Sequence, residues 1–145
     1  MRKDLHNNIK VVPMIYPVDH GTGNTATVSQ IVDMQDAQAT EIVGLLGSLA
    51  DADATFAVLI EDGNDSALAD NAEVAAANLL GTEAGASFIF SSDNMVFKVG
   101  YVGPKRYLRV TITPANNTGA ALIGVCAILT TNRGNPDTTQ LGTTA

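Results

Sequence analysis

The residue types that most often perform catalysis are few and scattered in this chain of 145 residues. Its two histidines, His6 and His20, lie in polar or turn-like sequence, away from any serine, cysteine or aspartate arrangement typical of a catalytic triad. Zinc would need several Cys, His or carboxylate ligands at close spacing, and that spacing is missing. The sequence also contains no phosphate-binding loop and no glycine-rich dinucleotide motif. We therefore expect no catalytic residue, no metal ion and no cofactor, and we expect that the protein is not an enzyme.

Two acidic stretches are the remaining candidates for metal chemistry. Asp51-Ala52-Asp53 and residues 61–65 could supply carboxylate and carbonyl oxygens to calcium, which takes such ligands from turns. Neither stretch has the spacing of an EF-hand loop with its terminal bidentate glutamate. Solvated turns account for both stretches without an ion. Calcium therefore stays an alternative, and no residue is assigned as a metal ligand.

Cys126 is the only cysteine and lies in the apolar run of residues 120–129. A single cysteine cannot form an internal disulfide, which excludes a disulfide-stapled secreted domain. Without a basic or histidine neighbour a reactive thiolate is not indicated, so we expect an inert core residue. The first ten residues lack the apolar region of a signal peptide, and no apolar stretch approaches the about 20 residues of a membrane span. We expect a soluble protein that is made in the cytoplasm.

Charge is sorted along the chain, whose formal net charge is −7. Residues 11–97 contain 13 carboxylates and no Lys or Arg, whereas basic residues predominate before and after this segment. Such a chain lacks the excess of Lys and Arg that neutralises nucleic-acid phosphates or binds anionic lipid. We expect neither nucleic acid nor a membrane as a partner. Opposite charges on different parts of the chain favour contacts between copies, so we expect a homo-oligomer.

Composition predicts one domain with an extensive core. Hydrophobic residues make up 46% of the chain and charged residues 16%, compared with about 25% charged residues in an average globular domain. About eight short strands alternate with turn signals, which is typical of an antiparallel β-sandwich or jelly roll. The predicted strands cover residues 9–16, 25–33, 40–46, 55–61, 86–90, 95–102, 105–113 and 120–130. In the seventh, alternation places Leu108, Val110 and Ile112 on one face.

Three parts follow from this pattern. Residues 1–17 form an extended arm or an edge strand, because Pro13 and Pro17 exclude them from the middle of a sheet. Residues 18–131 form the β-sandwich, and residues 132–145 form a polar tail that is flexible or ordered only in an assembly. Within the sandwich, residues 66–80 contain at most a short helical turn, with Asp65 or Ser66 as its N-cap.

Two features could mediate contacts with other protein. The apolar arm could add to the sheet edge of a neighbouring copy, or it could pair within its own sandwich. Basic residues interleaved with aromatic residues on two predicted strands could meet an acidic protein surface, or they could be solvated. The candidate interface residues are Ile9, Val11, Val12, Met14 and Ile15 in the arm, and Lys98, Tyr101, Lys105, Arg106, Tyr107 and Arg109 in the basic set.

The chain resembles a family of small virion proteins encoded by tailed phages and prophages. The resemblance covers roughly residues 4–130 and rests on turn-and-strand motifs. These motifs are DLHNNIK (4–10), GSLADADATF (47–56), LLGTE (79–83), VGYVGPKRY (99–107) and RVTITPANNTG (109–119). The resemblance implies a shared fold, and its closest functional analogy is to jelly-roll cement or decoration proteins, which bind the outside of a capsid. It carries over no site residue.

From this resemblance we expect a structural virion protein, a capsid cement protein that binds the outer surface of a tailed-phage head. Its expected partners are the major capsid protein and further copies of itself, and its expected location is the capsid surface after synthesis in the host cytoplasm. A tail or head–tail connector component is one alternative. A glycan-binding module on the virion surface is another, although the chain has no tryptophan to stack on sugars.

Overall fold

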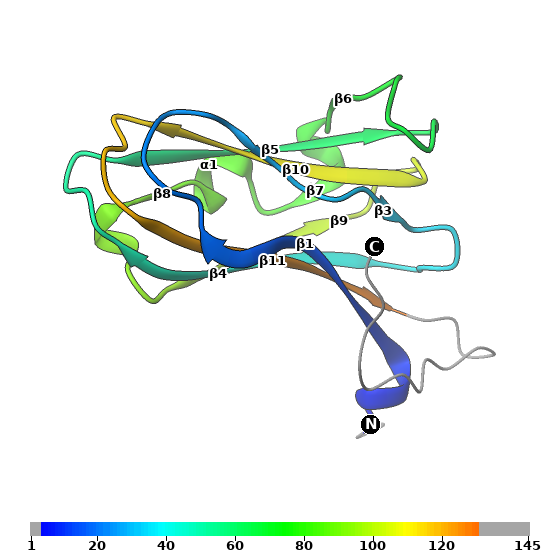
Figure 1. Ribbon diagram of the computed structural model, residues 1–145. Helices are drawn as coiled ribbons and strands as arrows, with labels where there is room; N and C mark the ends of the chain where they lie inside the picture. The colour runs from blue at the N-terminus through cyan, green and yellow to red at the C-terminus, as the bar shows by residue number, and fades with distance from the viewer. Residues whose placement is uncertain (1–3, 131–145) are drawn as a thin grey trace.

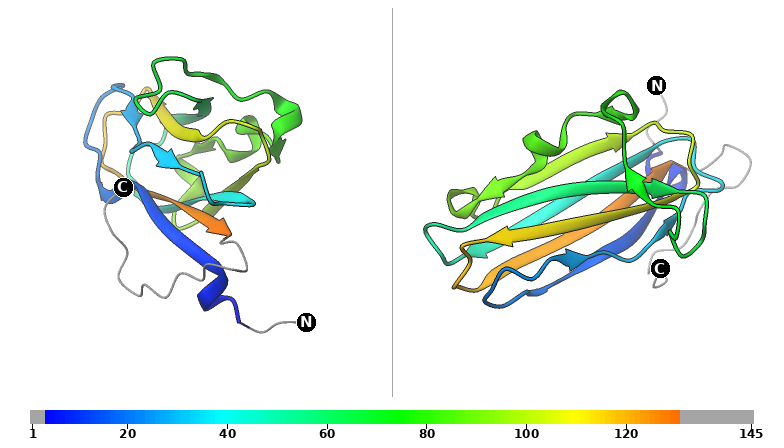
Figure 2. Two further views of the ribbon diagram at one scale, coloured as in Figure 1. Left: turned by 90° about the vertical axis from the view of Figure 1, so that its right-hand side faces the viewer. Right: turned by 90° about the horizontal axis from the view of Figure 1, so that it is seen from above.

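The computed structural model describes residues 4–130, which fold into two antiparallel β-sheets packed face to face (Figure 1). An end-on view shows the two layers, and a view from above shows that the long strands run along the length of the domain (Figure 2). The predicted all-β sandwich is therefore confirmed. The described residues form 11 strands, more than the eight predicted, because five of these strands are only two residues long and show no alternation.

The first sheet has five strands in the order β1-β11-β4-β9-β7. Apolar residues on its inner face meet in rows across the strands. Ile42, for example, pairs with Ala127 on one side and Val99 on the other, and all three are buried. The strands are β1 (Ile9–Asp19), β11 (Ala121–Thr130), β4 (Thr40–Leu49), β9 (Val96–Tyr101) and β7 (Leu79–Leu80).

The second sheet has six strands, and its centre is the pairing of β5 with β10. The predicted inward face of β10 is confirmed, since Leu108, Val110 and Ile112 are all buried. Short strands flank this pair: β2 and β3 lie along β10, and β6 and β8 lie along β5. The strands are β2 (Thr27–Val28), β3 (Val32–Asp33), β5 (Thr55–Gly63), β6 (Ala72–Glu73), β8 (Phe88–Ile89) and β10 (Tyr107–Ala115).

The core between the sheets contains a stack of three phenylalanine rings. The ring centroids of Phe56 and Phe88 are 4.8 Å apart, and those of Phe88 and Phe97 are 5.8 Å apart. Phe97 pairs directly with Gly44 on β4, and its ring occupies the space that a side chain at residue 44 would need. The glycine therefore lets the ring lie flat against the sheet and join the two layers.

Within residues 4–130, helical structure is confined to short turns. Residues 66–80 contain one 3₁₀ turn, η2 (Ala76–Asn78), so the predicted short turn is present, but its N-cap is Ala75 and the predicted N-cap at Asp65 or Ser66 is wrong. Asp65 instead accepts a hydrogen bond from the amide of Ala67. The four-residue helix α1 (Glu83–Ala86) was not predicted, although Thr82 caps it through the amide of Gly85. The other turns are η1 (His6–Asn8) and η3 (Phe90–Ser92). No helix among residues 4–130 is both long and apolar enough to cross a membrane.

The predicted arm is, from residue 9 onward, strand β1 at the edge of the five-stranded sheet. It pairs with β11 from Ile9 to Asp19, with register shifts on either side of Ile15 that accommodate the two prolines. Of the two possibilities open for this segment, the structure therefore shows pairing within its own sandwich. Residues 132–145 lie outside the described residues.

Candidate interaction surface

The outer face of the five-stranded sheet is largely apolar and exposed. On β4, the residues between the buried positions point outward, so that Val43 and Leu45 lie on this face. Leu45 pairs with Val96 of β9, and the two side chains are 56% and 60% exposed. The same face carries Val11 and Pro13 from β1, Leu122, Cys126 and Ile128 from β11, Val43 and Leu45 from β4, Val96 from β9, and Leu80 from β7. These residues are called the apolar face below.

Glycines bring the side chains of the apolar face close to the backbone. Gly100 lies between Glu41 and Leu80 in register, and a Cβ atom there would lie 3.0 Å from the Leu80 Cβ. In the same way the Leu122 side chain lies against Gly47. The face is therefore shallow at Gly47 and Gly100, and its apolar side chains lie beside the charged side chains of Glu41 and Lys98.

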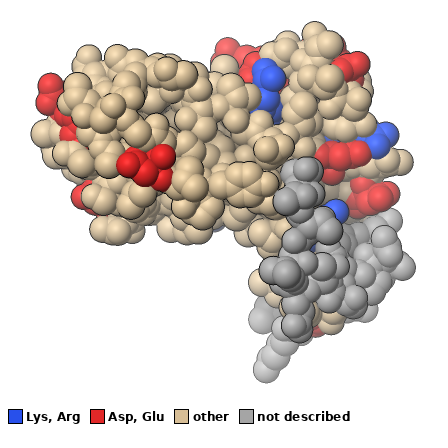
Figure 3. All heavy atoms as spheres, in the orientation of Figure 1, with Lys and Arg blue, Asp and Glu red and all other residues tan. Residues whose placement is uncertain are grey.

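Charge is nearly absent from this sheet. In the five strands only Asp19 and Glu41 are acidic, and only Lys10 and Lys98 are basic, so the sheet is neutral within a chain of formal charge −7. Glu41 and Lys98 lie on the apolar face as diagonal neighbours on β4 and β9, since Glu41 pairs with Gly100 and Lys98 with Val43. Figure 3, in the orientation of Figure 1, shows that most of the surface on that side is neither acidic nor basic.

The beginning of the described chain projects from this side of the molecule. Figure 1 shows η1 and the start of β1 leaving the sandwich beside the outer side of the five-stranded sheet. Asp4 stabilises the turn, because its carboxylate accepts hydrogen bonds from the backbone and the side-chain amide of Asn7. Leu5 on this projection is 67% exposed.

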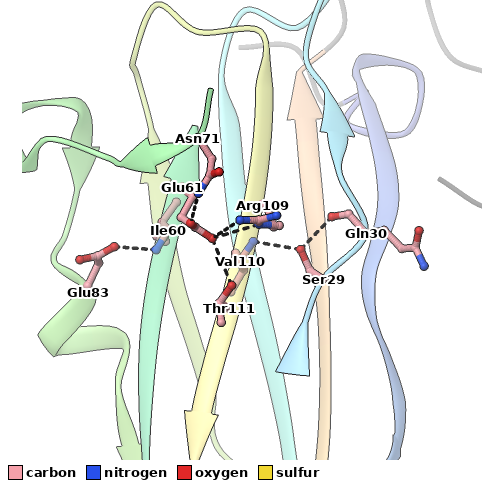
Figure 4. Close-up of polar contacts among 9 residues, drawn as sticks. All are labelled: Ser29, Gln30, Ile60, Glu61, Asn71, Glu83, Arg109, Val110 and Thr111. Carbon is pink, nitrogen blue, oxygen red and sulfur yellow. Dashed lines mark hydrogen bonds and ion pairs between the residues drawn. The ribbon is translucent and has the colours of Figure 1, made fainter. Parts of the chain in front are cut away.

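The outer face of the six-stranded sheet is different, because polar side chains bind one another there. Glu61 on β5 is buried and accepts hydrogen bonds from Arg109 Nε at 3.0 Å and from Thr111 Oγ1 at 3.2 Å, both on β10 (Figure 4). Arg109 Nη2 also lies 2.9 Å from the same carboxylate oxygen, and Asn71 donates to the other oxygen. The charge of Glu61 is therefore neutralised within the chain.

Side chains also close both edges of the β5–β10 pair at one level of the sheet. Ile60 and Val110 are partners in register. The Ile60 amide donates to Glu83 Oε1 at 2.6 Å, and the Val110 amide donates to Ser29 Oγ at 2.9 Å, so these oxygens replace the missing neighbouring strands (Figure 4). Burial raises the pKa of Glu83, the Ile60 hydrogen bond opposes this, and the Glu73 carboxyl raises the pKa further.

The predicted interface residues do not form one surface. Val12, Met14, Ile15 and Tyr101 are buried, which corrects their assignment as interface residues. The Tyr101 hydroxyl donates to Asp62 at 2.7 Å, and both burial and this contact raise its pKa. Ile9 is half-buried, while Val11 and Lys98 lie on the apolar face, where their role as interface residues stays a prediction.

The remaining basic candidates lie on or beside β10. Arg109 is bound to Glu61, and Arg106 forms a two-pronged ion pair with Asp33, with Nε–O and Nη2–O distances of 2.8 Å and 2.6 Å. The Arg106 guanidinium also lies over the Tyr107 ring, 5.0 Å from its centroid, and it lowers the pKa of Asp33. Lys105 is half-buried. Two of the four cations of the basic set, Arg106 and Arg109, therefore bind acids of their own chain.

The acidic turns use their carboxylates to fix the backbone. Asp51 accepts hydrogen bonds from the amide and the hydroxyl of Thr118, which lower its pKa. Asp70 accepts from the amides of Asn64 and Asp65, with the same effect on its pKa. In the part of the chain that the structure describes, no three His, Cys, Asp or Glu side chains converge to hold a metal ion.

Cys126 was expected in the core, and the structure corrects its position. It pairs with Pro13 and Val43 on the outer side of the sheet and is only half-buried. Burial raises the pKa of its thiol, so the neutral thiol predominates at neutral pH. The continuous apolar run of β11 hid this position, because both faces of the strand carry apolar residues.

The protein is an antiparallel two-sheet β-sandwich in which the outer face of the five-stranded sheet carries exposed apolar side chains. Neither a family model nor a curated protein matches the sequence. Among solved structures, a chain of the infectious bursal disease virus Gx strain matches with a TM-score of 0.51 and 8% identity over 85% of this chain. The match spans only 32% of the viral chain, and it shows a shared fold.

Two further matches are more distant. The SPBc2 prophage-derived protein YomS matches with a TM-score of 0.36 and 9% identity, covering 84% of this chain and 92% of that one. A family 35 carbohydrate-binding module from an environmental isolate matches with a TM-score of 0.38 and 12% identity, covering 94% and 96% of the two chains. These similarities are too low to support an inference about function.

Proposed function

We propose that this protein is a structural component of a tailed-phage particle, a capsid cement protein on the outer surface of the head. In this proposal it is not an enzyme, and it stabilises the shell through contacts with the major capsid protein and with further copies of itself. The observation that carries the proposal is the apolar face, since an exposed apolar surface of this extent indicates a contact with another protein chain, either the capsid protein or a further copy of this one.

The charge distribution supports a position outside the shell. A protein on the outer surface does not need to bind the packaged DNA, and a chain of formal charge −7 would be repelled by it. The two cations Arg106 and Arg109 are already bound to Asp33 and Glu61. The projection of η1 and the start of β1 supplies a second contact surface for a neighbouring subunit (Figure 1).

Removal and re-addition of the protein test this function. Heads assembled without the protein should release their DNA at a lower temperature than complete heads, because they lack the contacts that hold neighbouring capsid subunits together. Re-addition of the purified protein should restore the release temperature, and incubation with buffer alone should not. An unchanged release temperature after removal would contradict the proposal.

A further inference from the structure

The apolar face is too exposed to be stable as free surface in a soluble protein. Leu45, Val96 and Leu80 are each more than half exposed, and they come from three adjacent strands of one sheet. Monomers rarely expose contiguous apolar patches larger than a few hundred Å². Val11 and Leu122 extend the patch across β1 and β11. An exposed apolar patch that reaches across all five strands is typical of a protein–protein contact surface.

The size of the face matches a stable protein interface. Five strands about 4.8 Å apart and a central strand of ten residues at about 3.4 Å per residue give a projected area of about 650 Å². The accessible area of such a corrugated surface exceeds its projection. A standard interface buries about 800 Å² on each partner, so the face alone supplies most of one.

The charges of the face fit a second copy of the same chain. Two copies with a net charge of −7 repel each other over most of their surfaces, but the five-stranded sheet carries equal numbers of acidic and basic residues. On the apolar face itself, Glu41 and Lys98 are adjacent and opposite in sign. Among residues 4–130, Lys98 forms no ion pair within its own chain.

We propose that the apolar face packs against the same face of a second copy across a two-fold axis. An axis that passes between Glu41 and Lys98 places each lysine opposite the glutamate of the other copy, so that one contact is formed twice. Leu45 and Val96 then lie beside these ion pairs in the centre of the interface. The pairing goes beyond the proposed function and does not depend on it, and the contact with the shell then uses other surfaces.

The molar mass of the purified full-length chain in solution, measured over a range of concentrations by sedimentation equilibrium, tests this pairing. The wild-type chain should change from 15.0 kDa to twice that mass as its concentration rises. Leu45→Asp and Val96→Asp should each weaken dimerisation at least about thirtyfold, because they place a carboxylate in the centre of the interface. Val28→Asp is the matched control, since Val28 is 55% exposed on the other sheet, and it should dimerise like the wild type.

Charge reversal tests the two-fold geometry. Lys98→Glu and Glu41→Lys should each weaken the dimer, because like charges then face each other across the axis. The double variant should recover most of the wild-type dimerisation constant. A chain that remains monomeric at every concentration would overturn the proposal, as would a dimer that is weakened equally by Val28→Asp or one that the double variant fails to restore.

The results also separate this pairing from the proposed function. If the chain dimerises in solution but is absent from purified phage heads, the pairing is supported and the cement function is contradicted. A chain that is present in the heads but monomeric in solution, with Leu45→Asp still binding to heads, contradicts the pairing and leaves the cement function standing.

Discussion

Glu83 and Ile60 form the contact that closes the outer edge of β5, with the Ile60 amide donating to Glu83 Oε1 at 2.6 Å. Nearby, the Val58 amide donates to Ser87 Oγ, whose hydroxyl in turn donates to the carbonyl of Glu83. The side chains of Glu83 and Ser87 therefore accept the hydrogen bonds that a neighbouring strand would accept along the edge of β5 between β8 and β6. An edge closed in this way cannot pair with a strand of another molecule.

The first prediction concerns the stability of this edge. Glu83→Ala should lower the free energy of unfolding by about 1–3 kcal/mol, because the Ile60 amide loses its partner in a partly buried position. Glu83→Gln keeps an oxygen acceptor and should lose much less. Chemical denaturation of the two variants measures both free energies of unfolding. Equal losses of stability would contradict a stabilising role for the hydrogen bond from the Ile60 amide.

The second prediction concerns pH. Because the pKa of Glu83 is raised in the folded protein, the folded state retains its proton at a pH where the unfolded chain has lost it. This residue's contribution to stability should therefore fall as pH rises from the ordinary glutamate pKa through the folded pKa. Glu83→Gln removes the titration. The stability of the wild type relative to this variant should decrease over that pH interval and stay constant above it; the opposite slope would contradict the shift.

The third prediction compares two arginines. Arg109→Ala should destabilise the protein by about 1–3 kcal/mol, because it leaves the buried Glu61 carboxylate without its cation. Arg106→Ala should have a much smaller effect, since its ion pair with Asp33 is exposed to solvent on both sides. Thermal unfolding of both variants at one pH tests the difference. Equal melting temperatures would show that burial does not distinguish the two pairs.

The fourth prediction concerns the packing of the Phe97 ring against Gly44. Gly44→Ala should destabilise the protein by about 1–3 kcal/mol or more, because the added Cβ would overlap the buried ring of Phe97. Gly21→Ala is a useful contrast, since a Cβ there meets no atom within 4 Å, although its φ of +74° adds backbone strain. A Gly44→Ala variant as stable as the wild type would contradict the packing of this ring.

Much of the fold could be predicted because it depends on local patterns. The alternation along β10 indicated the buried positions Leu108, Val110 and Ile112, and the prolines indicated that the first strand lies at an edge. The very short strands could not be predicted, since two residues have no period, and their pairing depends on residues far away in sequence.

The candidate surface was harder to predict, for two physical reasons. Tyr101 and Arg109 of the basic set were predicted to lie on the surface, because their partners Asp62 and Glu61 are 39 and 48 positions away in the sequence. The apolar face was missed because residues 42–46 and 121–129 form continuous apolar runs, which indicate burial on both sides. In a two-layer sandwich only one side of each sheet meets the core, so these runs also indicated an exposed apolar face.

The most direct test of the proposed function is the number of copies of this chain per particle. Quantitative mass spectrometry of purified virions gives the ratio of this chain to the major capsid protein. A cement protein spread over the head predicts a ratio near one to one, or a simple fraction such as one to two. A ratio of one to several tens would place the chain in the tail or connector, and its complete absence from virions would contradict a structural role in the particle.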